Sequence, residues 1–394
     1  MQKTADYDII IAGAGAAGLS LLWHLLNSRS EQIRNTSILV ADLSLTPSND
    51  KTWCFWDTES MPFSDLVHHT WNRLEVKAHG QLFSGELKHH KYHCMRSVDY
   101  AERILNLAGA RNNVTLLETG IKGFSSKNEG ALMETEKGTY SATWIFQSAL
   151  KPPGFDRARV DISLMQHFLG WEIETNTPLF DPEKATLMDF DIDQDNGVAF
   201  MYLLPFTEKK VLIEHTLFSP SLLTDEQYER GIRTYLKNVY HLQEDDYTIR
   251  RKEKGVIPME DRRYSTEWCD RVFNTGTVGG LTKPSTGYTF TRIHRQSADI
   301  LEALEKNQKP VLDQASGYRF RVYDMMLLHI LETHPGISVK IFRELFKRNT
   351  FDRILQFLEE KTSLHQEVAI FASLPYMPFF RAIWNTKQRI LTGA

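Results

Sequence analysis

Residues 7–28, YDIIIAGAGAAGLSLLWHLLNS, contain the pattern that decides the fold. The β-branched run at 9–11 is typical of a buried parallel strand, and a helical leucine pattern follows it. Between them, Gly13, Gly15 and Gly18 have G-x-G-x-x-G spacing. The first glycine permits a tight turn, the second lets the backbone approach a pyrophosphate, and the third allows a helix to pack closely on a strand.

A second strand supports the interpretation of this segment as a dinucleotide site. SILVAD, residues 37–42, ends in Asp42, at the place where an acid can bind ribose hydroxyls. The helix N-terminus presents free N–H groups to an anion. These residues alone do not separate NAD from FAD, and a tight turn without a ligand is the structural alternative.

Composition limits the class of protein. The chain has 394 residues, of which 42% are apolar and 24% charged, as in an ordinary globular protein of two or three lobes. Its net charge of -4 gives no reason to expect a nucleic-acid partner. Cys54, Cys94 and Cys269 lack CxxC spacing, which fits a reducing compartment and argues against a disulfide framework or a metal site. Residues 9–26 are interrupted by three glycines, so we expect a soluble strand–turn–helix there.

The rest of the chain divides at KPPGFD, residues 151–156. Short strands are expected before it, and strands of a mostly antiparallel sheet after it, at 165–176, 185–192, 198–206 and 210–218. A second glycine turn, NTGTVGG at 274–280, leads through a proline-containing loop into a helix. Two such turns suit a long, two-ended cofactor. After about residue 320 the chain is predicted to be helical.

Glu214 and His215 stand side by side in VLIEHTLFSP, an apolar strand-like run. Alternation places Glu214 on one face with Leu212, Thr216 and Phe218. A four-residue hairpin loop, TEKK, predicts that Glu214 lies opposite Leu203 and His215 opposite Tyr202. A carboxyl among apolar neighbours is paired, hydrogen-bonded or protonated, so Glu214 is either a structural carboxylate or an acid held ready for chemistry.

Taken together, these segments resemble the lycopene cyclase family, in particular its bacterial β-cyclases, among flavoproteins of the glutathione-reductase type. The matching segments are DIIIAGAGAAGLSLLWHLL, ILVAD, KTWCFW, FLGWEIET, LMDF, FMYLLPF, VLIEHTLFS, IPME and GGLTKPSTGYTF. The first two indicate only FAD or NAD binding, whereas the middle and late segments are more specific.

The resemblance implies an α/β fold with a Rossmann-like FAD-binding domain, an antiparallel β-sheet substrate domain and a helical C-terminal region. The expected boundaries are 1–60, 95–150 and 255–310 for the FAD domain, 60–95 and 151–254 for the substrate domain, and 311–394 for a membrane-facing helical region. The cofactor residues it implies are Gly13, Ala14, Gly15, Ala17, Gly18, Asp42, Arg96, Gly279, Gly280, Thr286 and Gly287. One departure is Thr277, where many flavoproteins place an aspartate.

The implied reaction is the redox-neutral cyclisation of the ψ end groups of lycopene, or a related linear carotene, to β-ionone rings. It requires reduced FAD, with NAD(P)H as the expected donor. Glu214 matches the glutamate of the family's acidic motif, and His215 stands where a second acid often follows. Protonating an alkene needs a positioned acid and a site that stabilises carbocations. The remaining candidates are His215 and Asp189 for catalysis and the aromatic faces of Trp171, Tyr202 and Tyr288 for the substrate.

Each candidate also has a structural interpretation, and two other functions remain open. Residues 371–394 are rich in aromatic and basic side chains and have no acids, which suits a membrane surface, although a helix docked on the core is equally consistent. We therefore expect a cytoplasmic protein attached peripherally to the membrane, with room for contact with other carotenoid-pathway enzymes. The alternatives are a flavin monooxygenase or reductase acting on an isoprenoid, and a non-catalytic prenyl-lipid-binding protein.

Overall fold

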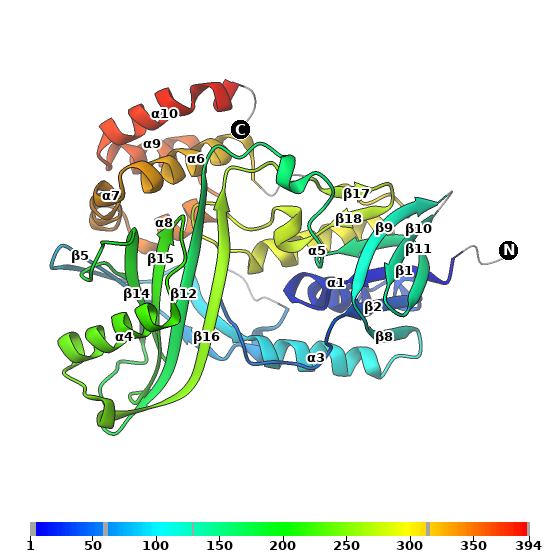
Figure 1. The fold of residues 1–394 in the computed structure, drawn as a ribbon, viewed down its shortest axis with the longest axis horizontal. Coiled ribbons are helices and arrows are strands. Elements are labelled where there is room, and N and C mark those ends of the chain that lie inside the picture. Colours follow the sequence, from blue (N-terminus) through cyan, green and yellow to red (C-terminus); the bar gives the residue numbers. More distant parts are fainter. Residues whose placement is uncertain (1–4, 58–61, 128–129, 313–315, 392–394) are drawn as a thin grey trace.

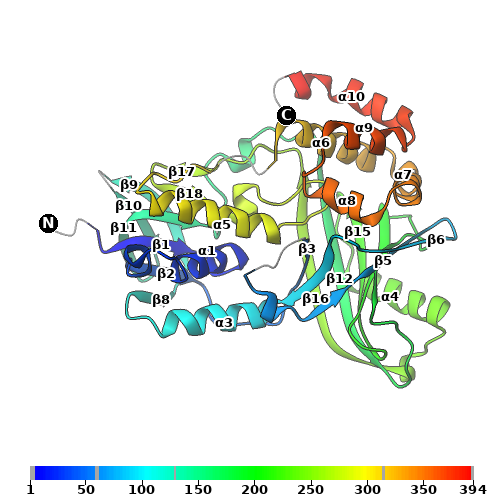
Figure 2. The same cartoon turned by 180° about the vertical axis from the view of Figure 1, so that it is seen from behind.

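The structure, a computed structural model, describes residues 5–57, 62–127, 130–312 and 316–391. The last three residues of the C-terminal aromatic stretch, 392–394, lie outside this part. The described strands form three sheets. The sheet that contains residues 7–12 lies at one end of the molecule, and the C-terminal helices lie above the other end (Figures 1 and 2). The predicted α/β fold class is confirmed.

The first sheet contains the segment quoted at the outset. Its order is β17-β18-β11-β1-β2-β8, with β10 and β9 added as an antiparallel extension. The core strands run parallel, and Ile10 and Ile11 of β1 are fully buried because both sheet faces are covered. The strands are β1 (Tyr7–Ala12), β2 (Ile38–Asp42), β8 (Val114–Glu118), β9 (Ile121–Lys127), β10 (Gly130–Thr135), β11 (Gly138–Gln147), β17 (Glu267–Cys269) and β18 (Val272–Asn274). Helix α1 (Ala16–Leu26) packs against α3 (Ser97–Gly109) and α5 (Phe290–Glu305).

The glycines between β1 and α1 are required by close contacts. Gly13 has φ +107°, which L side chains rarely adopt. A Cβ on Gly18 would lie 1.8 Å from the Gly13 carbonyl oxygen, so the turn and the helix start touch through backbone alone. A Cβ on Gly15 would meet nothing within 4 Å, which leaves open space beside the helix N-terminus.

The second sheet has the order β16-β12-β15-β14-β13-β5-β6 and is antiparallel except between β13 and β5. Its strands are β5 (Arg73–Ala78), β6 (Gln81–Glu86), β12 (Ser163–Thr175), β13 (Lys184–Asp189), β14 (Val198–Pro205), β15 (Lys210–Ser219) and β16 (Tyr247–Glu260). Helix α4 (Asp225–Tyr240) covers one face of this sheet. The other face shares a core with C-terminal helices and with a three-stranded sheet of β3 (Thr52–Asp57), β7 (Lys91–Arg96) and β4 (His69–Trp71).

The predicted hairpin register between β14 and β15 is wrong by one residue. Glu214 lies opposite Tyr202, and His215 lies opposite Met201. The physical reason is Thr207, whose hydroxyl accepts the N–H groups of Lys209 and Lys210 and closes the loop one residue early. The predicted alternation holds, because Leu212 and Phe218 pack in the core away from α4.

As predicted, the described chain after residue 316 is helical, and its helices are α6 (Tyr318–Thr333), α7 (Pro335–Arg348), α8 (Phe351–Leu358), α9 (Leu364–Ala372) and α10 (Tyr376–Leu391). Helix α10 packs on α6 through Phe379 and Ala382. In the described part of the chain, no helix combines the length and the apolar character needed to cross a bilayer.

The glycine contacts predict unequal effects of two alanine substitutions. Gly18→Ala forces the backbone of the turn away from α1 and should lower the free energy of unfolding by about 3 kcal/mol. Gly15→Ala meets open space and should change it by less than about 0.5 kcal/mol. Urea unfolding of the two variants measures the difference, and equal midpoints would contradict the close packing of Gly13 and Gly18.

Candidate active site

Gly170, at the middle of β12, makes room for two carboxyl groups. It lies opposite Glu214 of β15 on one side and opposite Glu253 of β16 on the other. A Cβ on Gly170 would lie 2.8 Å from Cγ of Glu214 and 3.4 Å from Cγ of Glu253. Both stems therefore use the space of the missing side chain, on the sheet face away from α4.

Glu214 is almost completely buried, with 6% of its surface exposed. Burial, the neighbouring Glu253 charge and a hydrogen bond to that side chain raise the pKa of Glu214 well above its usual range, and Arg251 opposes this weakly. These surroundings favour the protonated form of the Glu214 carboxyl.

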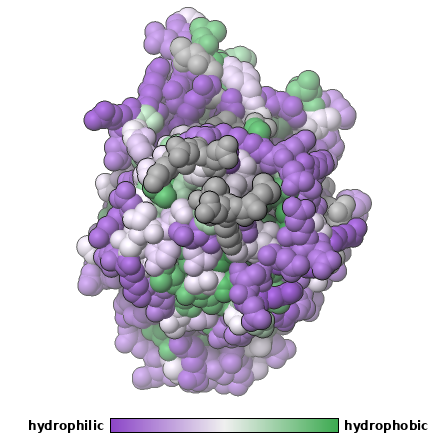
Figure 3. All heavy atoms as spheres, turned by 90° about the vertical axis from the view of Figure 1, so that its right-hand side faces the viewer, coloured by the Kyte–Doolittle hydropathy of each residue, from purple (hydrophilic) through white to green (hydrophobic). Residues whose placement is uncertain are grey.

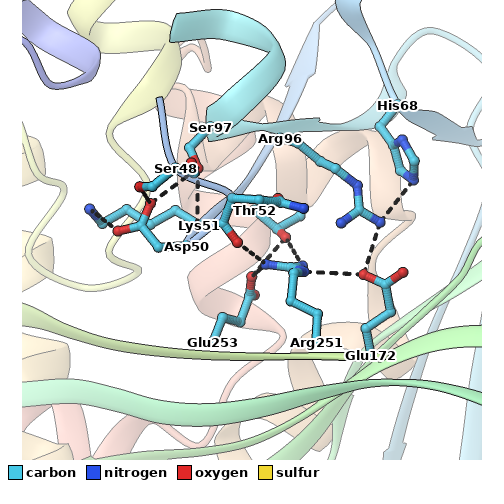
Figure 4. Close-up of polar contacts among 11 residues, drawn as sticks. Ser48, Asp50, Lys51, Thr52, His68, Arg96, Ser97, Glu172, Arg251 and Glu253 are labelled. Carbon is cyan, nitrogen blue, oxygen red and sulfur yellow. Dashed lines mark hydrogen bonds and ion pairs between the residues drawn. The ribbon is translucent and has the colours of Figure 1, made fainter. Parts of the chain in front are cut away.

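Glu253 belongs to a chain of polar groups, here called the ion-pair cluster: Glu253, Arg251, Glu172, Arg96 and His68 (Figure 4). Arg251 pairs with Glu253 and, at 3.2 Å, with Glu172, and Glu172 pairs with Arg96 at 2.9 Å. Thr52 of β3 bonds to both Arg251 and Glu253, at 2.8 and 2.9 Å. Arg96 contacts His68 at 3.1 Å, and burial and the Arg96 charge lower the pKa of His68 to about 4.

Three tyrosines, here called the tyrosine cluster, line the same face: Tyr92, Tyr202 and Tyr288. The hydroxyl of Tyr92 bonds to those of Tyr202 and Tyr288 at 2.7 and 2.8 Å. Burial raises the pKa of all three phenols, so they stay neutral. Tyr202 is the cross-strand neighbour of Glu214, and Tyr288 is close enough to Glu214 for the two side chains to interact electrostatically. Two predicted substrate residues thus lie beside the acid.

The structure does not bring His215, Asp189 and Trp171 to Glu214. His215 points toward α4, with Nδ1 3.4 Å from the Tyr228 carbonyl oxygen. Asp189 accepts a hydrogen bond from Tyr235 of α4 at 2.7 Å. Trp171 lies in the core under α4, with the Arg233 guanidinium 4.8 Å from its ring centre. These three side chains attach α4 to the sheet.

The two glycine turns predicted to hold a cofactor lie side by side. Gly276, at the start of a 3₁₀ turn (Gly276–Gly279), is so close to α1 that a Cβ on it would lie 2.9 Å from Cβ of Ala17. Gly279 and Gly280 touch backbone and Tyr264, so neither has room for a side chain. Both turns lie at the carboxyl end of β1, where nucleotides bind in such sheets.

Near the second turn, buried polar atoms lack partners among the described residues. Thr286 Oγ1 and Gln166 Oε1 are buried without a hydrogen bond, and a Cβ on Gly287 would lie 2.5 Å from Gln166 Oε1. These two atoms lie beside Gly287, which has φ +74° and no side chain. A ligand with a polar ring system could therefore come close enough to hydrogen-bond with them.

Asp42 and Arg96 make protein contacts. The Asp42 carboxylate accepts the Ala14 N–H at 2.5 Å and the Leu43 N–H at 2.6 Å, so it closes the glycine turn. Arg96 precedes α3 but extends into the ion-pair cluster, with its guanidinium 5.4 Å from the Phe206 ring centre. Their roles in cofactor binding stay predictions.

Glu253, Arg251 and Tyr92 were missed by the sequence interpretation. In RRKEK, residues 250–254, every side chain is charged, so no alternation marks the inward positions. The available signal was Gly170, because a glycine inside a strand indicates close approach of another group.

Proteins of known structure have the same arrangement of helices and strands. A flavoprotein/dehydrogenase from Cytophaga hutchinsonii superposes with a TM-score of 0.58 at 12% identity, covering 98% of this chain and 99% of that one. The chain thus shares the overall fold of this flavoprotein.

The sequence relatives are more specific. The lycopene beta-cyclase of Pantoea ananas is 25% identical over 406 residues, covering 98% of both chains. That of a Paracoccus species is 25% identical over 315 residues, covering 76% of this chain and 74% of the relative. The family described as lycopene cyclase protein matches residues 8–384, and the chain belongs to it.

The raised pKa of Glu214 predicts a pH-dependent gain in stability for Glu214→Gln. The unfolded chain releases this proton near pH 4.5, whereas the folded chain retains it to higher pH, so wild-type stability falls as pH rises above that value. Glutamine has no proton to release and can donate the same hydrogen bond. The variant should match the wild type below the unfolded pKa and become increasingly more stable above it.

Urea unfolding at roughly pH 4 to 8 measures this difference. Glu174→Gln is the matched control, because Glu174 lies on β12 but pairs with Arg250 at the sheet surface. A constant difference between Glu214→Gln and wild type at all pH values would contradict a protonated Glu214.

Proposed function

We propose that this protein is an isomerase that cyclises the ψ end groups of lycopene to β-ionone rings, giving γ-carotene and then β-carotene, with reduced FAD bound. The observation that carries the proposal is the buried Glu214 carboxyl, whose pKa is raised by its surroundings and which lies beside the tyrosine cluster. Family membership supports the substrate class and the reaction.

Glu214 is suited to be the acid. Adding a proton to an unactivated alkene requires a donor that stays protonated at neutral pH and excludes water, because water would capture the cation. Glu214 has both properties. Its proton goes to the terminal double bond, which leaves a tertiary cation, and the neighbouring double bond closes the ring.

The tyrosine cluster is suited to stabilise this cation. The aromatic faces of Tyr202 and Tyr288 offer cation–π attraction in a desolvated site. Their hydroxyls are tied to Tyr92, so the rings are held in fixed positions. Fixed rings lower the reorganisation needed when charge develops.

The residues present fit FAD. The open space beside Gly15 and the N-terminus of α1 suit a pyrophosphate, and Thr286 and Gln166 offer unpaired polar atoms to a flavin ring. Reduced, anionic flavin bound there would supply negative charge near the cation without net electron transfer. Gly13, Gly15, Gly18, Gly279 and Gly280 would hold it.

Expression in a colourless host that makes lycopene tests the proposal. The wild type should turn red cells orange-yellow, and chromatography should show γ- and β-carotene. In a purified assay with lycopene in lipid vesicles, NAD(P)H should be needed to reduce the flavin but not be consumed in proportion to product. Unchanged lycopene would refute the proposal, and stoichiometric NAD(P)H and oxygen consumption would indicate a monooxygenase.

Glu214→Gln should lose cyclisation by roughly 10²-fold or more, since glutamine cannot donate an acidic proton. The same variant should retain flavin absorbance in its purified form, and Glu174→Gln should retain activity. Substantial turnover by Glu214→Gln would remove Glu214 from the acid role.

Helices α9 and α10 are suited to attach the protein peripherally to a membrane. Apolar side chains on these helices are exposed by 40% or more: Leu364, Val368, Tyr376, Met377, Phe380, Ile383, Trp384 and Leu391. Arg381 and Lys387 are exposed beside them. The face of the molecule toward β9–β11 is mostly hydrophilic (Figure 3). Phe371 and Phe379 instead dock inward on α6.

Replacing Phe380 and Trp384 together by serine should weaken binding to vesicles that contain anionic lipid. Each side chain would lose burial worth about 2 kcal/mol, so cosedimentation should fall at least tenfold. Exposed Leu82, on β6, provides a matched control as Leu82→Ser. Equal sedimentation of the double variant and the wild type would place the membrane contact elsewhere.

A further inference from the structure

Glu253 is buried next to the proposed acid, and the reaction described above gives it no role. We propose that Glu253 is the ionised partner of Glu214, and that the two carboxyls together hold one proton, which they give to the substrate and take back after ring closure. Glu253 is in this sense a positioning residue. The inference rests on the proposed function and deepens it.

The first support is geometry. Glu214 and Glu253 both lie opposite Gly170, and their Cγ atoms approach the space that a Gly170 side chain would fill. Arg251 and Thr52 both bond to the Oε2 atom of Glu253, so its other oxygen is available to Glu214. The Glu253 carboxylate is therefore held from behind, and only its free side meets the acid.

The second support is charge balance. The ion-pair cluster contains two carboxylates, Glu172 and Glu253, and two guanidinium groups, Arg96 and Arg251. His68 is neutral because its pKa is lowered to about 4. The cluster is therefore neutral without Glu214, and a Glu214 carboxylate would add an uncompensated buried charge. Because Glu253 holds the direct ion pair with Arg251, the proton belongs on Glu214.

The reaction itself needs such a pair, because one proton enters and one leaves. The Glu214 O–H bond breaks as a C–H bond forms at the terminal alkene carbon. During ring closure both carboxyls are negative and face the cation. A ring C–H bond then breaks, its electron pair becomes the ring double bond, and the proton returns to the pair. The site ends with one proton and one negative charge, as it began.

The groups that act on Glu214 come from several elements. They are Tyr202 of β14, Arg251 and Glu253 of β16, Cys54 of β3, and Tyr288 of the loop before α5. Only Arg251 and Glu253 carry charge. The Glu253 charge raises the pKa of Glu214, and Arg251 lowers it. The fall of kcat/KM at alkaline pH, here called the alkaline limb, thus reports on the effect of the Glu253 charge on Glu214.

Glu253→Gln tests the proposal in the flavin-loaded enzyme with lycopene in vesicles. We expect kcat to fall roughly tenfold or more while KM changes little, since the substrate is still bound. The alkaline limb should move to lower pH, because the charge that keeps the proton on Glu214 is gone. Glu253→Asp keeps this charge and should leave the limb where the wild type has it, with a reduced kcat.

A purely structural role for Glu253 would lower stability and activity without moving the limb, and that outcome would overturn the proposal. The proposal would also be overturned if Glu253→Gln had the kcat and the alkaline limb of the wild type, or if the alkaline limb of Glu253→Asp moved to lower pH. If Glu253→Gln does not fold, the result for Glu253→Asp alone decides the test. Glu174→Gln should behave as the wild type. Failure of the wild type to make cyclised product would instead refute the proposed function itself.

Discussion

Water is excluded from the Glu214 carboxyl while the charges around it are already balanced, and the rest of the site depends on this constraint. Burial alone would favour the neutral form of any carboxyl. Here Arg96 and Arg251 are also paired with Glu172 and Glu253, so neither guanidinium is paired with Glu214. These surroundings favour the protonated form of Glu214, as the proposed acid role requires.

Sheet geometry creates this arrangement. Glu214 and Glu253 come from strands on either side of β12, and Gly170 between them leaves space that any larger residue would fill. The opposite face of the same sheet is closed by α4. Adjacent residues on one strand consequently serve different ends: Glu214 faces the site, and His215 faces α4.

The sequence predicts those features that depend on local spacing. The glycines of the first turn and the apolar face of β15 need only their own segments, so their positions follow from periodicity. The predicted register between β14 and β15 was wrong by one residue because a single hydroxyl, that of Thr207, shortens the loop between them. Glu253 and Tyr92 could not be assigned, since their importance arises from strands distant in the chain. Asp189 and Trp171 were plausible by residue type, but α4 occupies their side of the sheet.

The most direct measurement is the infrared spectrum of the purified protein at neutral pH, compared between the wild type and a form in which position 214 cannot ionise. The account predicts a carbonyl stretch from a protonated carboxylic acid in the wild-type spectrum that disappears when Glu214 is replaced by glutamine. If the difference spectrum instead shows loss of a carboxylate band, Glu214 is ionised in the folded protein and the account is contradicted.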